Sequence, residues 1–493
     1  MGNKLFYDVE DKPKFGKMLI FALQQVLAIL AATIAVPAII KLPVQMPAAI
    51  LGAGVGTLIY QLFTRRKSPV FLGSSFAFLG SLTCAVLYGY CGIILGSAVA
   101  GLVYVVIAAI IKITGTGWVN KLMPPVIIGP TVALIGLSLA VNAMGDLVKT
   151  NVSTVYSSYN LVAMLCGLIA FVTIIVCSTQ KRYQMPRLIP FIIGIAAGYA
   201  AATVFTVIGN VANIDYLRII NFQPLVDNFV VDGNFRGITA IVDYPRFALL
   251  EAIQELTSGQ LSQGILDANQ ALAEESGVTR NPVMLNMSGA VEVIVAFLPV
   301  ALVVFAEHIA DHKNLGAIIG RDLIAEPGLS RTLLGDGVGS IMGTLFGVCP
   351  NTTYGESVGC VAITRNASVV TITTTAIMCI VLSFIRPVMV LLQTIPSCVM
   401  GGVCLTLYGF IAVSGLKMFK HLDLGNNKNL FVVAAILISG IGGLTIQIPY
   451  QFAENGAVTG VIKITSIATA LILGIITNAI LTKVENSKLG KEK

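Results

Sequence analysis

A group of ionisable side chains stands where a long apolar run of the chain comes to its end. Glu307 follows the apolar run 291–306, and His308 and Asp311 come directly after it. Because Glu307 and Asp311 are four residues apart, a helix would place them on one face. Carboxylates that are poorly solvated and close to one another suit the uptake and release of a proton. We therefore expect Glu307, His308 and Asp311 to carry a proton together with a substrate, the alternative being an ordinary acidic cluster at an exposed helix end.

Another acidic residue, Glu356, opens a short segment after a break between two apolar runs. The stretch from Pro350 to Gly355 contains the polar and turn-forming residues that make this break. Backbone that breaks at membrane depth must be buried in protein or line a wet cavity. The free N–H groups at the start of a helix favour a bound acceptor or anion, and Gly355 would let a flat ligand approach the backbone. We expect Gly355 and Glu356 to contact a substrate.

A matching break lies in the first half of the chain, where Ser75 and Phe76 follow the interruption at Ser68-Pro69. Phe76 can offer a ring face for stacking, the alternative being an aromatic residue that faces lipid or the protein core. Two carboxylates, backbone N–H groups and one aromatic ring suit a planar, neutral molecule with adjacent N–H and C=O groups. A heterocyclic base fits this description better than a sugar or an inorganic anion. Asp336 has two interpretations, a helix cap or a bridge to the proton-bearing group.

The composition predicts a helical protein that crosses a membrane many times. The chain has 493 residues, of which 56% are hydrophobic and 11% charged, and its mean hydropathy is +0.87. Soluble domains carry roughly 25% charged residues. The net charge of +7 comes from basic residues in short loops beside apolar runs, so we expect no nucleic-acid partner. The nine cysteines have no metal-binding spacing, and we expect no metal and no cofactor other than the proton.

Apolar segments recur at the length that a lipid bilayer requires. They fall near 17–40, 47–63, 68–87, 90–111, 122–144, 160–178, 187–209, 290–310, 336–348, 355–364, 367–385, 391–415, 429–448 and 457–482. Lysines and arginines in alternate short loops predict about fourteen spans with both termini in the cytoplasm. The polar segment 210–288 then lies outside, and its part 247–275 has the pattern of a surface helix, either a substrate lid or an extracellular cap.

Spacing also indicates an internal repeat. Gln24 and Ser74 are fifty residues apart in the first half, and Glu307 and Glu356 are forty-nine apart in the second. Each second member follows a Pro- or Gly-interrupted segment, and such matching interruptions mark the central site of many transporters. Because each half has seven spans, the halves enter the membrane from opposite sides. We therefore predict an all-α protein of two inverted seven-segment repeats with broken spans 3 and 10.

The chain resembles the nucleobase–ascorbate transporter family, and within it the bacterial uracil and xanthine permeases. The resemblance covers nearly the whole chain, and its most specific parts are Ala306-Glu307-His308 and the stretch from Pro350 to Arg365. It implies symport of a base with a proton across the cytoplasmic membrane, usually by a homodimer in which a core domain moves against a gate domain like an elevator. The implied boundaries are 17–113 and 289–388 for the core, and 119–209 and 389–483 for the gate.

The same resemblance implies roles for single residues. Glu307, Gly355, Glu356 and Phe76 would contact the substrate, and we include Ser75 with them. Tyr408 would face the site from the gate side, and Asp311, Asp336 and His308 would take part in proton coupling with Glu307.

The chain departs from the family pattern at three positions. Gln25 stands where many members have histidine, Asp311 where some uracil permeases have histidine, and Ser357 where the signature usually has asparagine. The first two bear on the proton path, and the third bears on selectivity.

Several functions remain to be weighed. Uracil is the first choice of substrate, and a xanthine or purine permease is the alternative. An anion transporter of the same fold is less favoured, because two acids would repel the anion. A membrane enzyme would need a nucleophile–base pair or a metal cluster, and Ser75 and Ser357 have no evident histidine partner.

Overall fold

A computed structural model describes most of the chain. It covers residues 5–42, 46–152, 156–180, 182, 186, 190–231, 234–235, 237–242, 244–277, 279–452 and 458–489. Lys181 and Arg187, two of the basic residues used to predict the orientation, lie outside the described residues. We call outer the side on which α9 ends and α13 begins, and inner the opposite side.

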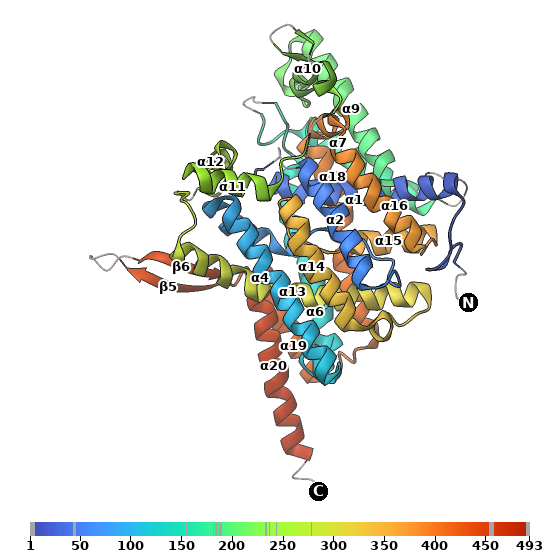
Figure 1. Cartoon of the computed structure of the whole chain (residues 1–493), viewed down its shortest axis with the longest axis vertical. Helices are drawn as coiled ribbons and strands as arrows, with labels where there is room; N and C mark the ends of the chain where they lie inside the picture. Colours follow the sequence, from blue (N-terminus) through green and yellow to red (C-terminus); the bar gives the residue numbers. More distant parts are fainter. Residues whose placement is uncertain are drawn as a thin grey trace.

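Helices occupy most of the described chain (Figure 1). The first half contains α1 (Phe15–Ile39), α2 (Met46–Phe63), η2 (Phe76–Phe78), α3 (Leu79–Ala85), η3 (Val86–Tyr88), α4 (Gly89–Thr114), α5 (Gly117–Leu122), α6 (Pro125–Leu147), α7 (Leu161–Thr179) and α9 (Pro190–Ala212). The second half contains α13 (Met287–Ile319), η6 (Ile324–Gly328), α14 (Leu329–Phe346), α15 (Gly355–Thr364), α16 (Val369–Ser383), α17 (Arg386–Gln393), α18 (Ser397–Lys417), η7 (Met418–His421), α19 (Asn427–Ile441) and α20 (Ser466–Leu489). Between the halves lie η4 (Asp215–Leu217), α10 (Gln223–Phe229), β2 (Val230–Val231), β3 (Asn234–Phe235), η5 (Gly237–Ala240), α11 (Ala248–Ser258) and α12 (Gln263–Ser276).

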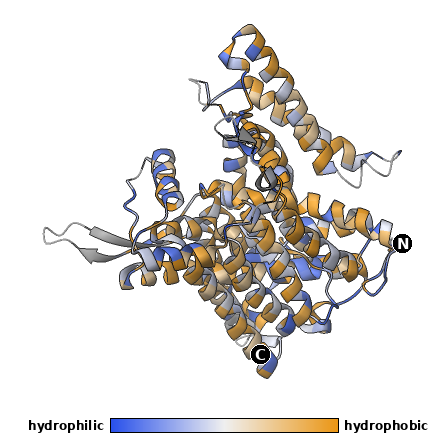
Figure 2. Cartoon of the chain, turned by 45° about the horizontal axis from the view of Figure 1, so that its top comes forward, coloured by the Kyte–Doolittle hydropathy of each residue, from blue (hydrophilic) through white to orange (hydrophobic). Residues whose placement is uncertain are grey.

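Many of these helices have lipid-facing character. Nine helical stretches among the described residues are long and apolar enough to cross a membrane, and α16 and α19 are shorter apolar helices. On α4 the side chains Leu102, Val106, Ile110 and Ile113 are exposed and recur every three or four residues. Such a stripe on the outside of a helix bundle meets lipid rather than a protein core. Figure 2 shows that apolar residues make up most of the length of the long helices.

Both predicted broken spans are present, and they begin side by side. Strand β1 (Leu72–Ser74) leads into η2 and α3, and strand β4 (Asn351–Thr353) leads into α15. The two strands pair antiparallel, with Gly73 opposite Thr352. This short ladder satisfies backbone groups at the break, where lipid cannot. Gly73 is required there, because a Cβ atom would lie 2.4 Å from the Tyr354 ring.

The ladder also corrects the correspondence that was predicted between the halves. Its antiparallel register relates Ser74 to Thr353 by two-fold symmetry, rather than to Glu356. Ser75 and Tyr354 then occupy equivalent positions, and each is the extended residue that precedes a half-helix. The repeat is inverted as expected, but Phe76 and Gly355 are the matching first residues of the two half-helices.

The long helices pack in two groups. In the first group, α14 packs against α2 and α4, α16 against α2 and α1, and α13 against α4 and α3. In the second group, α18 packs against α6 and α7, α9 against α7, and α19 against α6 and α20. We call these the α14 group and the α18 group. The predicted domain boundaries stay a prediction.

Two segments differ from what their sequence patterns predict. Residues 247–275 form two helices, α11 and α12, rather than one, because Gly259 ends α11 in the left-handed conformation. The final apolar segment was expected to begin near residue 457, but Val458–Ile464 is strand β6, which pairs with β5 (Ile446–Phe452). The β5–β6 hairpin projects sideways from the helices (Figure 1).

Candidate functional site

Helix α13 buries its group of ionisable residues inside the protein. Glu307, His308 and Asp311 are at most 9% exposed, and the helix continues for two further turns to Ile319. An exposed acidic cluster at a helix end is therefore the wrong interpretation. Helix α13 contacts α15, which carries Glu356. The predicted helix face shared by Glu307 and Asp311 is thus directed toward α15.

The ladder between the half-helices brings Asp311 to the start of α15. Thr353, the last residue of β4, donates its hydroxyl hydrogen to Asp311 Oδ2 at 2.8 Å. A Cβ atom on Gly355 would have Asp311 Oδ1 at 3.7 Å and no other described atom within 4 Å. The backbone at Gly355 is therefore approachable, as the sequence predicts. Glu356 follows in the first turn of α15 and is 4% exposed.

Several buried oxygen atoms of this region have no hydrogen-bond partner among the described residues. Three of them are Ser75 Oγ, Glu307 Oε2 and Glu356 Oε1, and Ser74 Oγ and Asp336 Oδ1 are others. A buried polar group without a partner costs about 1–3 kcal/mol, and more if it is charged. Such groups are uncommon in folded proteins and require a reason. Ser75 directly precedes η2, Glu307 lies on α13 and Glu356 on α15, and both η2 and α15 contact α13, which indicates a place for a polar ligand.

An aromatic pair joins the two groups of helices beside these oxygens. Phe76, the first residue of η2, packs edge-to-face against Tyr408 of α18, with ring centroids 5.1 Å apart. Both residues are buried, at 6% and 2% exposure. Phe76 therefore faces neither lipid nor the interior of one helix group. It lies at the boundary between the α14 group and the α18 group, where Tyr408 was expected.

His308 points away from Glu307 and bonds to helix α14. Its Nδ1 lies 2.7 Å from Asp336 Oδ2, and its Nε2 lies 3.0 Å from Thr332 Oγ1. Helix α14 begins at Leu329, so Asp336 does not cap it. The second interpretation of Asp336, a residue linked to the group on α13, agrees with this contact. The contact reaches His308, however, and not a carboxylate.

A second histidine, His312, extends this polar region toward the inner side. Its Nδ1 donates to the backbone carbonyl of His308 at 2.7 Å, so in the neutral ring Nε2 is an acceptor. Nε2 lies 2.7 Å from the Tyr60 hydroxyl, which is itself 2.8 Å from Ser68 Oγ. These side chains are fully buried, and the hydrogen bond between His312 and Tyr60 links α13 to α2.

Two of the positions that depart from the family pattern meet in the structure. Gln25 on α1 donates through Nε2 to Ser357 Oγ on α15 at 2.6 Å. Sequence reasoning found both residues but did not pair them. It used Thr353 only as part of the break between the apolar runs and did not single out Thr332, because a threonine gives no signal of its partner.

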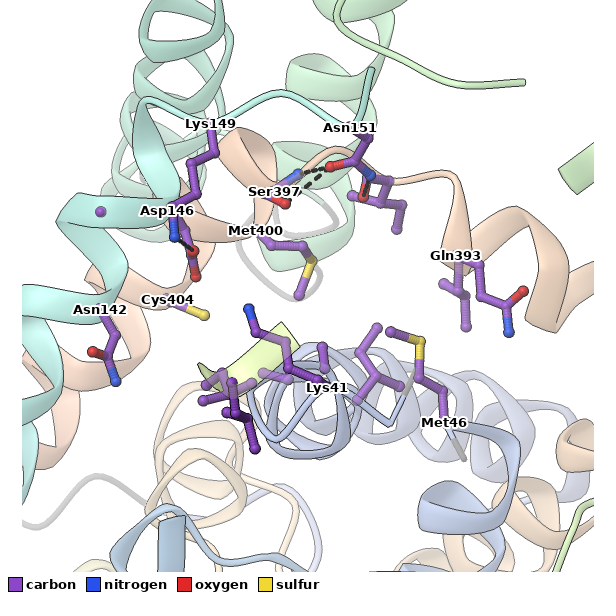
Figure 3. Close-up of a pocket in the computed structure, with 18 of the residues that line it drawn as sticks. Lys41, Met46, Asn142, Asp146, Lys149, Asn151, Gln393, Ser397, Met400 and Cys404 are labelled. Carbon is purple, nitrogen blue, oxygen red and sulfur yellow. Dashed lines mark hydrogen bonds and ion pairs between the residues drawn. The ribbon is translucent and has the colours of Figure 1, made fainter. Parts of the chain in front are cut away.

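A cavity of about 560 Å³ lies between the two groups on the outer side. In Figure 3 Lys41, just after α1, faces Asn142 and Asp146 of α6 and Cys404 of α18. Leu272 of α12 forms part of the same lining. Cys404 precedes Tyr408 by four residues, which is about one helical turn. The cavity therefore leads from the outer side toward the aromatic pair.

The side chains of the region are carboxylates, hydroxyls and an aromatic ring. The part of the chain that the structure describes holds no group of three or more His, Cys, Asp or Glu residues placed to bind a metal ion. Carboxylates, a hydroxyl and a ring instead surround one place at the paired ends of two half-helices. The sequence prediction of a planar, neutral ligand with several hydrogen-bonding groups stays a prediction.

Comparison with known proteins decides the family. A family model described as "Permease family" matches residues 16–448. The chain belongs to this permease family, the nucleobase–ascorbate transporters. It is therefore a multi-pass membrane permease, which rules out the membrane enzyme.

Curated relatives of this permease span its whole length. The uracil permease of Bacillus caldolyticus is 34% identical over 97% of the chain and 95% of the relative. The uracil permease of Bacillus subtilis is 33% identical over 99% of the chain and 97% of the relative. The uracil permease of Escherichia coli K12 is 28% identical over 95% of the chain and 92% of the relative.

Solved structures share the fold of this permease at low sequence identity. The transmembrane domain of the cyanobacterial bicarbonate transporter BicA matches with a TM-score of 0.52 and 13% identity, covering 95% of this chain and 98% of that one. The murine Slc26a9 anion transporter, in its inward-facing state, matches with a TM-score of 0.59 and 10% identity. The match covers 96% of this chain and 70% of that one. At such identities the likeness concerns the fold alone, which is the inverted repeat predicted above.

Proposed function

We propose that this permease takes up a nucleobase, with uracil as the substrate, together with a proton. The observation that carries the proposal is the group of three buried, unpartnered oxygens, on Ser75, Glu307 and Glu356, beside the Phe76 ring. Uracil is planar and carries ring N–H groups beside carbonyl groups. Its N–H groups can donate to the two carboxylates, and the backbone N–H groups near Gly355 can donate to a carbonyl.

The comparisons support uracil over the other candidates. Three relatives that match over nearly the whole chain are named uracil permeases. The structural neighbours are anion transporters, but two carboxylates in the site disfavour an anion in this protein. A xanthine or purine permease remains the alternative, because a larger base presents similar donors and acceptors.

Proton coupling follows if the substrate binds well in only one protonation state of the site. A ligand shifts an equilibrium only by its differential affinity for the two states. We propose that Glu307 and Asp311 hold the coupled proton, with His308 and Asp336 as the adjoining pair. Their placement supports this: Glu307 and Asp311 lie buried about one turn apart on α13, where two like charges favour sharing a proton, and His308 Nδ1 lies 2.7 Å from Asp336 Oδ2.

Movement of the α14 group against the α18 group would carry the substrate across the membrane. In this proposal residues 17–113 and 289–388 are the core, and residues 119–209 and 389–483 are the gate. Most contacts of the site come from the α14 group, and Tyr408 comes from the α18 group. We further propose a homodimer in the cytoplasmic membrane, with both termini on the cytoplasmic side.

Uptake of radiolabelled uracil into liposomes that hold the purified protein tests the function. We expect an inward proton gradient to stimulate uptake, a sodium gradient of equal size to leave it unchanged, and excess unlabelled xanthine not to compete. No uptake of uracil, or full competition by xanthine, would turn the assignment to purines. Stimulation by sodium alone would refute proton coupling and leave the substrate assignment intact.

A further inference from the structure

The two half-helices are held at the ends that lie far from the site. For α15 this end is on the inner side, where the N-terminal segment runs beside it. Phe6 N–H donates to Arg365 O at 2.8 Å, and Ala367 N–H donates to Tyr7 O at 2.9 Å. Arg321 fixes this N-terminal segment in turn, through Asp8 at 2.9 Å. A segment outside the repeat thus fastens one half-helix.

The outer end of the first half-helix is fastened in a similar way by the outer segment, residues 248–283. Three backbone carbonyls near the end of α3 and η3 accept hydrogen bonds from it. Thr83 O accepts from Arg280 Nη2 at 2.5 Å, Val86 O from Asn269 Nδ2 at 2.9 Å, and Leu87 O from Val283 N–H at 3.0 Å. The last carbonyls of a helix have no partner within it, and a cation near them is favoured by the helix dipole.

Further bonds make the outer segment a stiff support. Glu255 on α11 is 2% exposed, and its two oxygens accept from Tyr90 N–H at 2.9 Å and Ser262 N–H at 3.1 Å. One carboxylate therefore ties the first turn of α4 to the start of α12. Asn269 is 1% exposed and accepts from Arg280 Nε at 2.9 Å. All of these bonds reach elements of the α14 group or stay within the segment.

We propose that the outer segment is a positioning element for the substrate site, acting through Arg280, Asn269 and Glu255. The half-helix from Phe76 to Tyr88 is short, so it moves as one body. Its outer end is held by the outer segment, and its inner end presents Ser75 and Phe76. Loosening the outer end therefore displaces the ring and the hydroxyl that meet the substrate. The effect on transport rests on the proposed function, whereas the effect on the half-helix does not.

The first measurement is hydrogen–deuterium exchange of the purified protein, which needs no substrate. Arg280→Ala removes the donors to Thr83 O and Asn269, and we expect faster amide exchange in residues 79–88. Arg280→Lys keeps a cation at the helix end and should restore part of the protection. Arg218→Ala is the matched control, because Arg218 is also an outer arginine and bonds to Asp215 outside the half-helix. Unchanged exchange in Arg280→Ala would overturn the proposal.

The second measurement separates positioning from general damage. In liposome uptake we expect Arg280→Ala to raise the KM for uracil about three- to tenfold with kcat nearly unchanged, which is the size expected for one or two lost hydrogen bonds. Arg280→Lys should lie between this variant and wild type, and Arg218→Ala should match wild type. A fall in kcat alone, or no change in KM, would contradict a positioning role.

A second variant and the exchange measurement distinguish failure of this proposal from failure of folding or of the proposed function. If Arg280→Ala does not fold, Asn269→Leu removes the amide at similar size and is judged by the same exchange and KM criteria. If wild-type protein takes up no uracil, the proposed function fails, and the exchange measurement alone decides whether the outer segment holds the half-helix.

Discussion

Glu356 combines burial, a place in the first turn of α15 and an oxygen without a partner. Glu356→Gln keeps the size of the side chain but replaces a charged acceptor by an amide. A charge-assisted hydrogen bond contributes about 1.5–3 kcal/mol, so we expect kcat/KM for uracil to fall about 10- to 100-fold. Uptake kinetics in liposomes would show it, with Glu326→Gln as the control, since Glu326 is exposed. Unchanged uptake and selectivity would remove Glu356 from the site.

The contact between Gln25 and Ser357 predicts that the two positions act as a pair. A histidine at 25 or an asparagine at 357 alone would disturb a 2.6 Å hydrogen bond in a buried place. We expect Gln25→His and Ser357→Asn each to lower the affinity for uracil about 5- to 30-fold, which corresponds to about 1–2 kcal/mol. The double variant should recover part of the loss, and a double-mutant cycle on KM measures the coupling. Strictly additive losses would show that the positions act separately.

At the level of residues, the sequence identifies charged groups better than their partners. Glu307 and Glu356 stand out because a carboxylate in an apolar segment is costly. Thr332 does not stand out, because threonine is tolerated in apolar segments, and Thr353 stands out only as one of several polar residues at the break. The bond between Thr353 and Asp311 joins residues that are 42 apart in the chain, and only the folded arrangement of the ladder and α13 brings them together.

At the level of elements, interruptions were predictable and their pairing was not. Proline and polar turn-forming residues gather at Ser68-Pro69 and from Pro350 to Gly355, so both broken spans follow from local chemistry, whereas the single prolines Pro37, Pro130 and Pro299 lie inside continuous helices. The β1–β4 ladder depends on two segments that meet only after both halves have folded, and three-residue strands have no sequence pattern of their own. The β5–β6 hairpin was missed for a different reason, since its apolar residues resemble the start of a membrane helix.

The docking of α11 should depend on pH through Glu255. Burial raises the pKa of this carboxyl, and the hydrogen bonds from Ser262 and Tyr90 lower it by less. A group with a raised pKa in the folded state adds stability at low pH, and this contribution is lost as the pH rises through that pKa. When the pH is lowered from about 8 to about 5, we expect the Tm of wild type to rise by about 1–2 °C relative to the Tm of Glu255→Gln. Thermal unfolding in detergent at both pH values measures the difference, and a constant difference would contradict it.

At the level of the whole molecule, the cavity between the α14 and α18 groups makes a test of their relative movement possible. Ala38 of α1 and Gly145 of α6 both line it, and they belong to different groups. In a variant without native cysteines, we expect a bifunctional thiol reagent that joins Ala38→Cys to Gly145→Cys to reduce uptake at least about tenfold, because the groups can no longer move apart. Uptake before and after cleavage of the tether measures the effect.

The control for this tether must fill the same cavity without joining the groups. Asn142 and Met400 line the cavity too, but both belong to the α18 group. The same reagent between Asn142→Cys and Met400→Cys should leave most of the uptake in place. Equal inhibition by both tethers would mean that the reagent merely blocks the cavity, and full activity of the first tethered pair would exclude a large movement there.

The β1–β4 ladder has a consequence for how the protein is made. Leu72 leaves the ribosome 281 residues before its partner Thr353, a delay of about 15–55 s at ordinary rates of synthesis. Until then β1 has no strand to pair with, although it belongs at a depth where lipid offers no hydrogen bonds. The first half must therefore wait in an immature, partly hydrated arrangement during translation. Its final insertion is an event of the second half, so a nascent chain that stops before residue 353 has nine of the predicted spans but lacks Gly355, Glu356 and Tyr408 from its site.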